Sequence, residues 1–374
     1  MRLLYVSHSF PPIDRPLANI GGMQRVAVEL SEALAALPDI EFKPLVLRSS
    51  WRWIHVTSPG WLLATMMRIL HRAKRRDFDV VLFSSMVSAS MAPFLRRRLN
   101  RAGIPMAAIA HGLDVTQPGI YQRVLVRRIL GALDAVLPVS RATGRECRLR
   151  GMPEHRVHVI PNGVNPHRGA AASSNDALST LGAPKPSLLL CSVGRLVERK
   201  GFAWFVDHVM PLLPQSVHYW IAGSGPQVKA IEDATFRQGL SDRVRLLGRL
   251  DDASVTQLYR SADLLIVPNI PVPGDMEGFG VVMLEAGVSA TPTIAARLEG
   301  IQDVITEGKN GHLVRSGHAQ AFVDAILPYF RDRETLRKAS RRAADHTTAT
   351  FNWTIVASSY ASTLRAIVCA ARSE

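Results

Sequence analysis

Short runs of apolar residues recur through the first 140 residues of the chain, and longer segments with helical periodicity separate them. Runs of four or five consecutive apolar residues are typical of strands buried on both faces of a parallel sheet. Alternation of such strands with helices predicts a doubly wound α/β domain. The amphipathic segment from Met23 to about Leu37 is predicted to be a helix that ends before Pro38. The predicted strands cover residues 3–6, 43–47, 80–83, 106–110 and 135–139.

The same alternation restarts after a segment that lacks it. Residues 166–186 are small, polar and rich in proline, as is typical of a linker. We expect two doubly wound Rossmann-like domains, at 1–165 and 187–350, which face each other across a cleft and bind ligands at the carboxyl ends of their strands. Residues 351–374 are predicted to form a C-terminal helix that packs back toward the N-terminal domain. The strands predicted in the second domain are 187–193, 219–222, 244–247, 264–267 and 292–295.

The composition is that of a globular protein from a reducing compartment. The 374 residues are 47% hydrophobic and 20% charged, which supplies enough apolar side chain for two cores. Three cysteines without a CxxC pair exclude a disulfide scaffold and a cysteine zinc site. The apolar start is too short for a signal peptide, and no uninterrupted apolar run approaches the roughly 20 residues of a membrane span. We therefore expect a cytoplasmic protein.

Positive charge is concentrated in the first half of the chain. Of the formal net charge of +14, residues 1–165 account for +12, with 23 Lys and Arg against 11 Asp and Glu. Such an excess predicts an anionic partner, and charge alone leaves nucleic acid, anionic lipid and a phosphorylated substrate open. Three stretches, 68–76, 94–101 and 121–130, interleave arginine with Leu, Ile and Val. Each could be a solvated helix face, but three in one domain favour peripheral binding to the inner face of the cytoplasmic membrane.

The most specific pattern places two carboxylates eight residues apart. Glu277 lies in a glycine-rich loop, and Glu285 lies inside an almost wholly apolar helix, where an unpaired carboxylate would be costly. Gly278 and Gly280 leave room for a ligand near the backbone, and the start of the helix presents free N–H groups to an anion. The alternative is a solvated loop glutamate and a helix glutamate paired with an arginine. The pattern favours a ligand site.

Basic, histidine and glycine residues follow other predicted strands. Arg195 can clamp phosphate oxygens with two hydrogen bonds, and Lys200 adds a point charge, although a solvated basic turn would show the same residues. His111 is placed to face the cleft, while a lone histidine is more often structural. Gly21 and Gly22 close the first strand-to-helix loop, where they can bring amides against a phosphate or a sugar or simply form a turn.

Several familiar site patterns are absent or incomplete. Gly223 and Gly225 lack the third glycine of a dinucleotide fingerprint, and no P-loop sequence occurs. Asp77 and Asp79 resemble a metal-binding DxD pair, but they lead directly into a predicted strand and are interpreted as its cap. We therefore expect no metal site.

Together these segments resemble the retaining GT-B glycosyltransferases of family four, in the family's order and over almost the whole chain. The two glutamates with Gly-Phe-Gly between them, and the Gly-Arg-Leu…Lys-Gly segment that starts at Gly194, form a specific pair. The chain departs from the family where Glu299-Gly300 replaces a usual diglycine, a change expected to affect contacts to the donor sugar. Supporting segments are Gly21-Gly22, His111-Gly112, Pro161-Asn162-Gly163-Val164 and Ala222-Gly223-Ser224-Gly225-Pro226.

The resemblance implies a role for each matching residue. Arg195 and Lys200 would grip the donor diphosphate, and Glu285 would accept the ribose hydroxyls of the nucleotide. Glu277 and His111 would be catalytic, the first on the hydroxyls of the transferred sugar and the second near its anomeric centre. Backbone contacts to the donor would come from Gly21, Gly22, Gly278, Phe279, Gly280 and Val281.

The resemblance further implies transfer of a hexose from a nucleotide diphosphate sugar, with retention of configuration and without a metal or other cofactor. GDP-mannose and UDP-hexoses are the leading donors. The basic first domain fits a lipid-linked, polysaccharide or lipopolysaccharide acceptor. The alternatives are a sugar-nucleotide epimerase on the same fold and a basic nucleic-acid-binding protein, and an aromatic content of only 6% argues against the latter.

Overall fold

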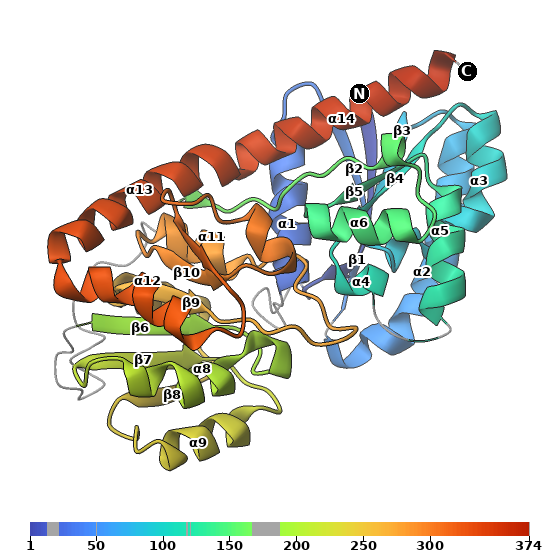
Figure 1. Ribbon diagram of the computed structural model, residues 1–374. Coiled ribbons are helices and arrows are strands. Elements are labelled where there is room, and N and C mark those ends of the chain that lie inside the picture. Colours follow the sequence, from blue (N-terminus) through green and yellow to red (C-terminus); the bar gives the residue numbers. More distant parts are fainter. Residues whose placement is uncertain (13–21, 50, 117–118, 120, 167–187, 374) are drawn as a thin grey trace. The chain divides into compact units, whose positions relative to one another are not determined.

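The computed structural model describes residues 1–12, 22–49, 51–116, 119, 121–166 and 188–373. It divides into two compact units, one made of Met1–Gly163 with Trp353–Glu374 and the other of Val164–Asn352. Each unit is built on a parallel sheet with helices between successive strands (Figure 1). This arrangement confirms the predicted fold class of two doubly wound domains. The predicted linker lies outside the described residues apart from Pro166.

The first unit has a five-stranded sheet in the order β2-β1-β3-β4-β5. The strand order reverses beside β1, where Val6 is in register with Phe83 of β3. Such a reversal is where open α/β sheets bind ligands. The strands are β1 (Arg2–Phe10), β2 (Glu41–Arg48), β3 (Val80–Phe83), β4 (Met106–Ala110) and β5 (Ala135–Pro138). The helices are α1 (Gly22–Ala35), α2 (Trp51–Lys74), α3 (Ala92–Arg101), α4 (Leu113–Thr116), α5 (Arg127–Ala132), α6 (Arg141–Leu149) and α14 (Trp353–Ser373).

Successive residues of β1 pack on opposite faces of this sheet, as the alternation of side chains along a strand requires. Leu4 and Val6 belong to a core that also contains residues of α2, α3 and α5, such as Ile69 and Leu95. The hydroxyl of Tyr5, in contrast, donates to the carbonyl of Ala27 in α1, 3.0 Å away. Both faces of the sheet are therefore covered, which explains why β3, β4 and β5 are continuous apolar runs. The edge strand β2 is less buried and carries charged residues.

Helix α14 packs against α1 although more than 300 residues separate them in the sequence. Trp353 Nε1 donates to Glu29 Oε2 of α1 at 2.6 Å. A Cβ atom on Gly163 would approach the Trp353 ring to 2.4 Å, so the turn that precedes the boundary between the units needs glycine there. By length and composition alone α14 could cross a membrane. In the structure, one of its faces is buried in the first unit, with Val356, Tyr360 and Leu364 at helical spacing.

The second unit has a six-stranded sheet in the order β11-β10-β9-β6-β7-β8. Its strand order reverses between β6 and β9, where Cys191 is in register with Leu265. The strands are β6 (Leu188–Val193), β7 (Val217–Ala222), β8 (Val244–Gly248), β9 (Leu264–Val267), β10 (Thr293–Ala296) and β11 (Gly311–Val314). The helices are α8 (Phe202–His208), α9 (Val228–Arg237), α10 (Asp252–Ser261), α11 (Val282–Val288), α12 (Ala319–Arg331) and α13 (Arg333–Phe351).

The last strand of the second unit was not expected from the sequence, whereas the C-terminal helix was. The strand β11 was not predicted, because its four residues begin with Gly311 and His312 and only Leu313 and Val314 are apolar. The C-terminal helix predicted in the range 351–374 is α14, which begins at Trp353 after Phe351 ends α13 and after Asn352, whose backbone is extended.

Candidate functional site

A group of charged side chains lies at the carboxyl ends of β6 and β9 in the second unit. The loop after β6 ends in a short 3₁₀ turn, Glu198–Lys200, and the loop after β9 contains Glu277. The Lys200 ammonium forms an ion pair with the Glu277 carboxylate. Arg199 Nη1 lies 2.7 Å from the same carboxylate, and its Nε lies 2.8 Å from Asp275 Oδ1. Two strand-end loops are thus joined at the reversal point of the sheet.

Burial makes the charge of Glu277 dependent on its cationic neighbours. Only 8% of this residue is exposed. Burial alone would raise the pKa of its carboxyl group, but Lys200 and Arg199 together lower that pKa to about 2. Asn269 Nδ2 also donates to Glu277 Oε2, at 3.2 Å. Glu277 is consequently ionised at neutral pH and holds both cations.

Arg195 belongs to the same loop and is exposed. The residue before it, Gly194, has a φ of 152° and lies so close to Lys200 that an added Cβ would contact Lys200 Cε at 3.6 Å. The positive charge of Arg195 also contributes to lowering the pKa of Lys200, after the larger effect of burial. The structure therefore brings Arg195, Lys200 and Glu277 together, with one cation open to solvent.

The glycine-rich loop after Glu277 leads into α11. In the described part of the chain, the amides of Phe279, Gly280 and Val281, which directly precede α11, donate no hydrogen bond to protein. The Phe279 side chain is 3% exposed and packs edge-to-face on Phe351, so only its backbone is available to a ligand. Gly280 has a φ of 91°, a left-handed conformation that favours glycine.

The Glu299-Gly300 segment lies directly against this loop. The Glu299 carboxylate accepts a hydrogen bond from the Glu277 amide, and the Gly300 amide donates to the Glu277 carbonyl at 3.1 Å. A Cβ on Gly300 would lie 2.0 Å from the Gly278 carbonyl oxygen. The departure from the usual diglycine thus adds a carboxylate that supports the loop, while the second glycine is sterically required.

Glu285 lies on α11, one turn beyond the loop. It is 7% exposed and accepts a hydrogen bond from the Tyr259 hydroxyl at 3.3 Å. The Tyr259 hydroxyl is therefore one of the groups that stabilise this buried carboxylate.

In the first unit, His111 follows β4 and is held from two sides. Its Nε2 lies 2.8 Å from the Ser84 carbonyl oxygen, and its amide donates to Asp114 Oδ1 at 2.8 Å. Asp114 Oδ2 accepts from the Met86 amide at 3.2 Å, which ties the loops after β3 and β4 together. Because the carbonyl can only accept, Nε2 carries the proton and a neutral His111 has its lone pair on Nδ1.

A second histidine lies close to His111. His8, near the end of β1, is 8% exposed, and its Nδ1 lies 3.4 Å from Ser85 Oγ. Burial, reinforced by the neighbouring His111, lowers the pKa of His8 to about 4. His8 is therefore neutral at physiological pH. Of the first-loop glycines, Gly21 lies outside the described residues, and Gly22 begins α1 with nothing within 4 Å of an added Cβ.

The sequence matches known families along both units. A family model described as Glycosyltransferase Family 4 matches residues 20–168, and one described as Glycosyl transferases group 1 matches residues 187–332. The phosphatidyl-myo-inositol mannosyltransferase of Mycobacterium leprae (strain TN) is 32% identical over 363 residues, 90% of this chain and 91% of that protein. The chain belongs to the group 1 glycosyltransferases of family 4.

Two further similarities extend over almost the full length. The D-inositol 3-phosphate glycosyltransferase of Xylanimonas cellulosilytica is 27% identical, over 94% of this chain and 93% of that protein. The crystal structure of Anabaena HepE in complex with UDP superposes with a TM-score of 0.76 at 18% identity, and covers 98% of this chain and 100% of that chain. The glycosyltransferase therefore has the GT-B fold.

Three site residues of the glycosyltransferase were not singled out from its sequence. Arg199 and Asn269 both contact the Glu277 carboxylate, and His8 lies beside His111. The signal for Arg199 is its place next to Lys200 in the same motif. Asn269 and His8 each follow an apolar run at the carboxyl end of a strand, where polar residues tend to be functional.

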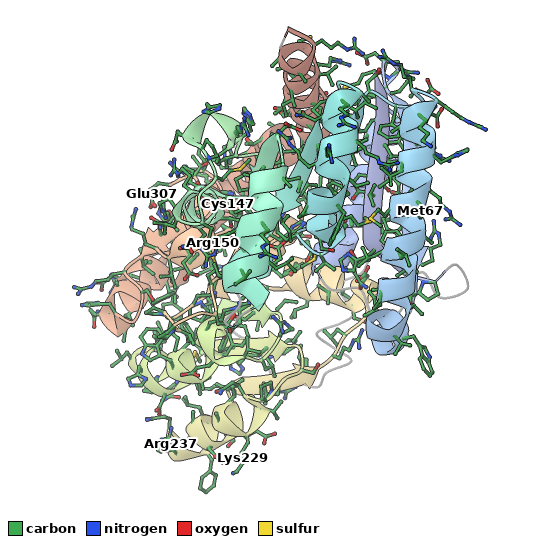
Figure 2. All side chains as sticks on the ribbon, turned by 90° about the vertical axis from the view of Figure 1, so that its right-hand side faces the viewer. Met67, Cys147, Arg150, Lys229, Arg237 and Glu307 are labelled. Carbon is green, nitrogen blue, oxygen red and sulfur yellow. The ribbon has the colours of Figure 1, made fainter. Side chains whose placement is uncertain are left out.

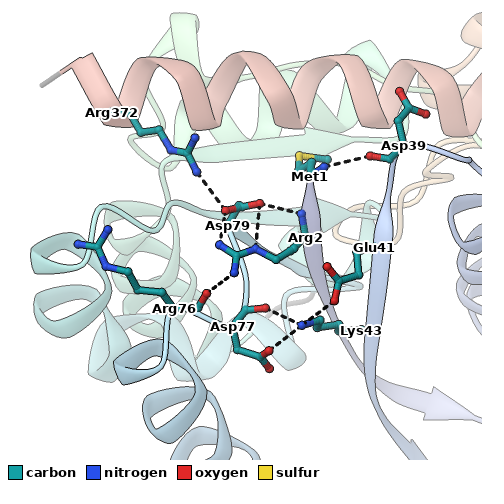
Figure 3. Close-up of polar contacts among 9 residues, drawn as sticks. All are labelled: Met1, Arg2, Asp39, Glu41, Lys43, Arg76, Asp77, Asp79 and Arg372. Carbon is teal, nitrogen blue, oxygen red and sulfur yellow. Dashed lines mark hydrogen bonds and ion pairs between the residues drawn. The ribbon is translucent and has the colours of Figure 1, made fainter.

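The aspartates before β3 lie at the amino-terminal edge of their sheet, and basic side chains pair with both of them (Figure 3). Asp77 Oδ1 is 2.6 Å from Lys43 Nζ, and Asp79 Oδ1 is 2.9 Å from Arg2 Nη2. Arg372 of α14 also pairs with Asp79, at 3.0 Å. Both carboxylates therefore stabilise the strand edge, in line with their interpretation as a strand cap, and Asp79 also holds α14.

Proposed function

We propose that this glycosyltransferase moves a hexose from a nucleotide diphosphate sugar to a lipid-linked or polysaccharide acceptor, with retention of anomeric configuration. The observation that carries the proposal is the cationic loop after β6, in which Arg195 is exposed and Lys200 is buried beside Glu277. Cations fixed in place before the reaction stabilise the negative charge that develops on a leaving diphosphate. In this proposal they act in place of a divalent metal.

Other residues of the two units would bind the rest of the donor. Glu277 would accept hydrogen bonds from hydroxyls of the transferred sugar, and Glu285 from the ribose. The amides of Phe279, Gly280 and Val281 would hold sugar or phosphate oxygens. His111 would contact the sugar near its anomeric centre through Nδ1, because Nε2 is engaged by Ser84.

For the donor nucleotide, GDP-mannose is our leading proposal and a UDP-hexose the alternative. The Mycobacterium leprae relative is named a mannosyltransferase, whereas the HepE structure contains UDP. For the acceptor, we propose an anionic or lipid-linked glycan, at the cytoplasmic face of a membrane. The charge of the first 165 residues, +12, supports this, and the acceptor in the relative's name is an inositol phospholipid.

A thermal-shift screen against GDP, UDP, ADP and their sugars tests the proposal. A ligand at 100 times its dissociation constant stabilises the folded state by about 2.7 kcal/mol. We expect stabilisation by one nucleoside diphosphate and by its hexose derivative. Proton NMR of the product formed with the selected donor would then show whether the anomeric configuration is retained. Absence of stabilisation by every nucleotide sugar would contradict the proposal.

A further inference from the structure

Helix α2 of the first unit has an unusual outer face. Its inner face contributes Ile69 and Ala73 to the core. Its outer face exposes four large apolar side chains, with exposed fractions of 56% for Trp53, 71% for Val56, 61% for Leu63 and 60% for Met67. The steps of three, seven and four residues place all four on one side of the helix. Met67 is labelled on α2 in Figure 2.

This pattern is the reverse of an ordinary surface helix, which carries polar residues on the side away from the core. Among the side chains that the structure describes from Trp53 to Met67, the other exposed ones are small or weakly polar, at positions 57, 59, 60 and 64. Exposed basic side chains follow from Arg68 and continue through Lys74 to Arg76. No Asp or Glu occurs between residues 51 and 76.

Helix α3, which contacts α2, continues the same surface character. Phe94 is 73% exposed, and Arg97 and Arg98 are exposed beside it. Arg96, in contrast, forms an ion pair with Asp134 and belongs to the fold. The two helices therefore present apolar side chains together with exposed positive charge. Among the basic residues at the end of α2, Arg72 pairs with Asp77 at 3.7 Å.

We propose that the outer face of α2 inserts into an anionic lipid bilayer, with Val56, Leu63 and Met67 at the acyl boundary and the cations of Arg68–Arg76 on lipid phosphates. Apolar side chains flanked by cations are the combination that holds a helix in the plane of a membrane. A second copy of the chain is a poorer occupant, because it would bring two basic surfaces together. This inference rests on the proposed action at a membrane and identifies the element that makes the contact.

Vesicle flotation separates insertion from electrostatic adsorption. The vesicles contain phosphatidylcholine and phosphatidylglycerol in equal parts, and the experiment is run at low salt and in about 1 M NaCl, where the Debye length falls to about 3 Å. We expect part of the wild-type protein to stay bound in high salt. The triple variant Val56→Ser, Leu63→Ser, Met67→Ser should lose at least about tenfold in its salt-resistant partition coefficient, because burial of one such side chain already accounts for that factor.

Two control variants define the specificity of this loss. Phe236→Ser removes an 84% exposed aromatic ring from α9 in the second unit and should bind vesicles like the wild type. Arg97→Glu with Arg98→Glu should weaken binding at low salt and leave the salt-resistant fraction unchanged. Complete release of the wild type by high salt would overturn the proposal, as would equal salt-resistant binding of the triple variant.

Light scattering distinguishes membrane insertion from self-association. Nucleotide binding distinguishes a failure of this inference from a failure of the proposed function. If light scattering shows that the triple substitution converts a dimer to a monomer while vesicle binding persists, the face binds a second copy and the proposal is wrong. Nucleotide binding by the triple variant should equal that of the wild type. Failure of the wild type to bind any nucleotide sugar would overturn the proposed function and leave the vesicle result standing.

Discussion

Lys200 and Glu277 form a buried ion pair that joins the loop after β6 to the loop after β9. Removing one member of a buried pair costs about 3–5 kcal/mol because the other charge is left uncompensated. The pair therefore holds the two loops in position in the protein without donor. In our proposal, a donor diphosphate that reaches Lys200 would share it with Glu277, and the exposed Arg195 would supply the additional positive charge.

The acid stability of the second unit should depend on Glu277. Its pKa of about 2 lies below the ordinary 4.5, so the unfolded chain takes up a proton at a higher pH than the native protein does. The stabilisation is fully present above pH 4.5 and is lost as the pH falls toward 2. We expect the melting temperature of the wild type to fall more steeply below pH 4.5 than that of Glu277→Gln. Parallel curves for the two proteins would contradict the assignment.

His8 should affect stability in a different pH range. Its pKa of about 4 lies below the ordinary 6.5, because burial disfavours the charged imidazolium. The unfolded state is protonated first as the pH falls, so stability is lost between pH 6.5 and 4, at up to about 1.4 kcal/mol per pH unit. Urea unfolding of His8→Gln should show a flatter pH dependence in this range. The exposed His208→Gln is the control and should retain the wild-type slope.

Gly300 should be intolerant of even one methyl group. A Cβ there would lie 2.0 Å from the Gly278 carbonyl oxygen, so the loop that begins at Glu277 must move. Gly300→Ala is expected to lower stability by about 1–3 kcal/mol, as overpacking does, and to weaken donor binding. Gly131 has no atom within 4 Å of an added Cβ, so Gly131→Ala should be neutral or stabilising by up to about 1 kcal/mol. Equal unfolding free energies for the two variants would refute the steric argument.

Much of the fold follows from local patterns. The buried strands of both sheets are short apolar runs, so their positions and the strand ends at Val193 and Ala110 could be predicted. β11 could not, because only its pairing with β10 makes Gly311–Val314 a strand. The exposure of the apolar side chains on the outer face of α2 could not be predicted either, since apolar residues of a helix are normally interpreted as its buried face.

The candidate site, too, could be predicted from the sequence only in part. Arg195, Lys200, Glu277 and Glu285 stand in motifs whose spacing is visible in the sequence. The contacts of Arg199 with Glu277 and of His8 with Ser85 join residues about 77 positions apart, and only the sheet order brings them together. Likewise, the support that Glu299 gives to the Glu277 amide depends on how the turn after β10 packs.

Glycosyl transfer should not require a divalent metal. In our proposal Arg195 and Lys200 neutralise the leaving diphosphate, and Asp77 and Asp79 are engaged by Lys43, Arg2 and Arg372. We expect the initial rate of product formation to be the same within error after treatment with EDTA. A strict need for Mg²⁺ or Mn²⁺, restored by adding the ion back, would show that carboxylates of this chain bind a metal.

Calorimetric titration of Arg195→Ala, Lys200→Ala and the double variant tests the central claim most directly. The ligands are the nucleoside diphosphate selected by the thermal-shift screen and the corresponding nucleoside, which lacks phosphate. Each substitution removes a charge-assisted hydrogen bond worth about 1.5–3 kcal/mol, so each should raise the dissociation constant of the diphosphate by roughly tenfold or more. Nucleoside affinity should stay unchanged, and circular dichroism should show that the fold is retained. If the folded double variant binds the diphosphate as tightly as the wild type, these two residues do not hold the donor and the account is wrong.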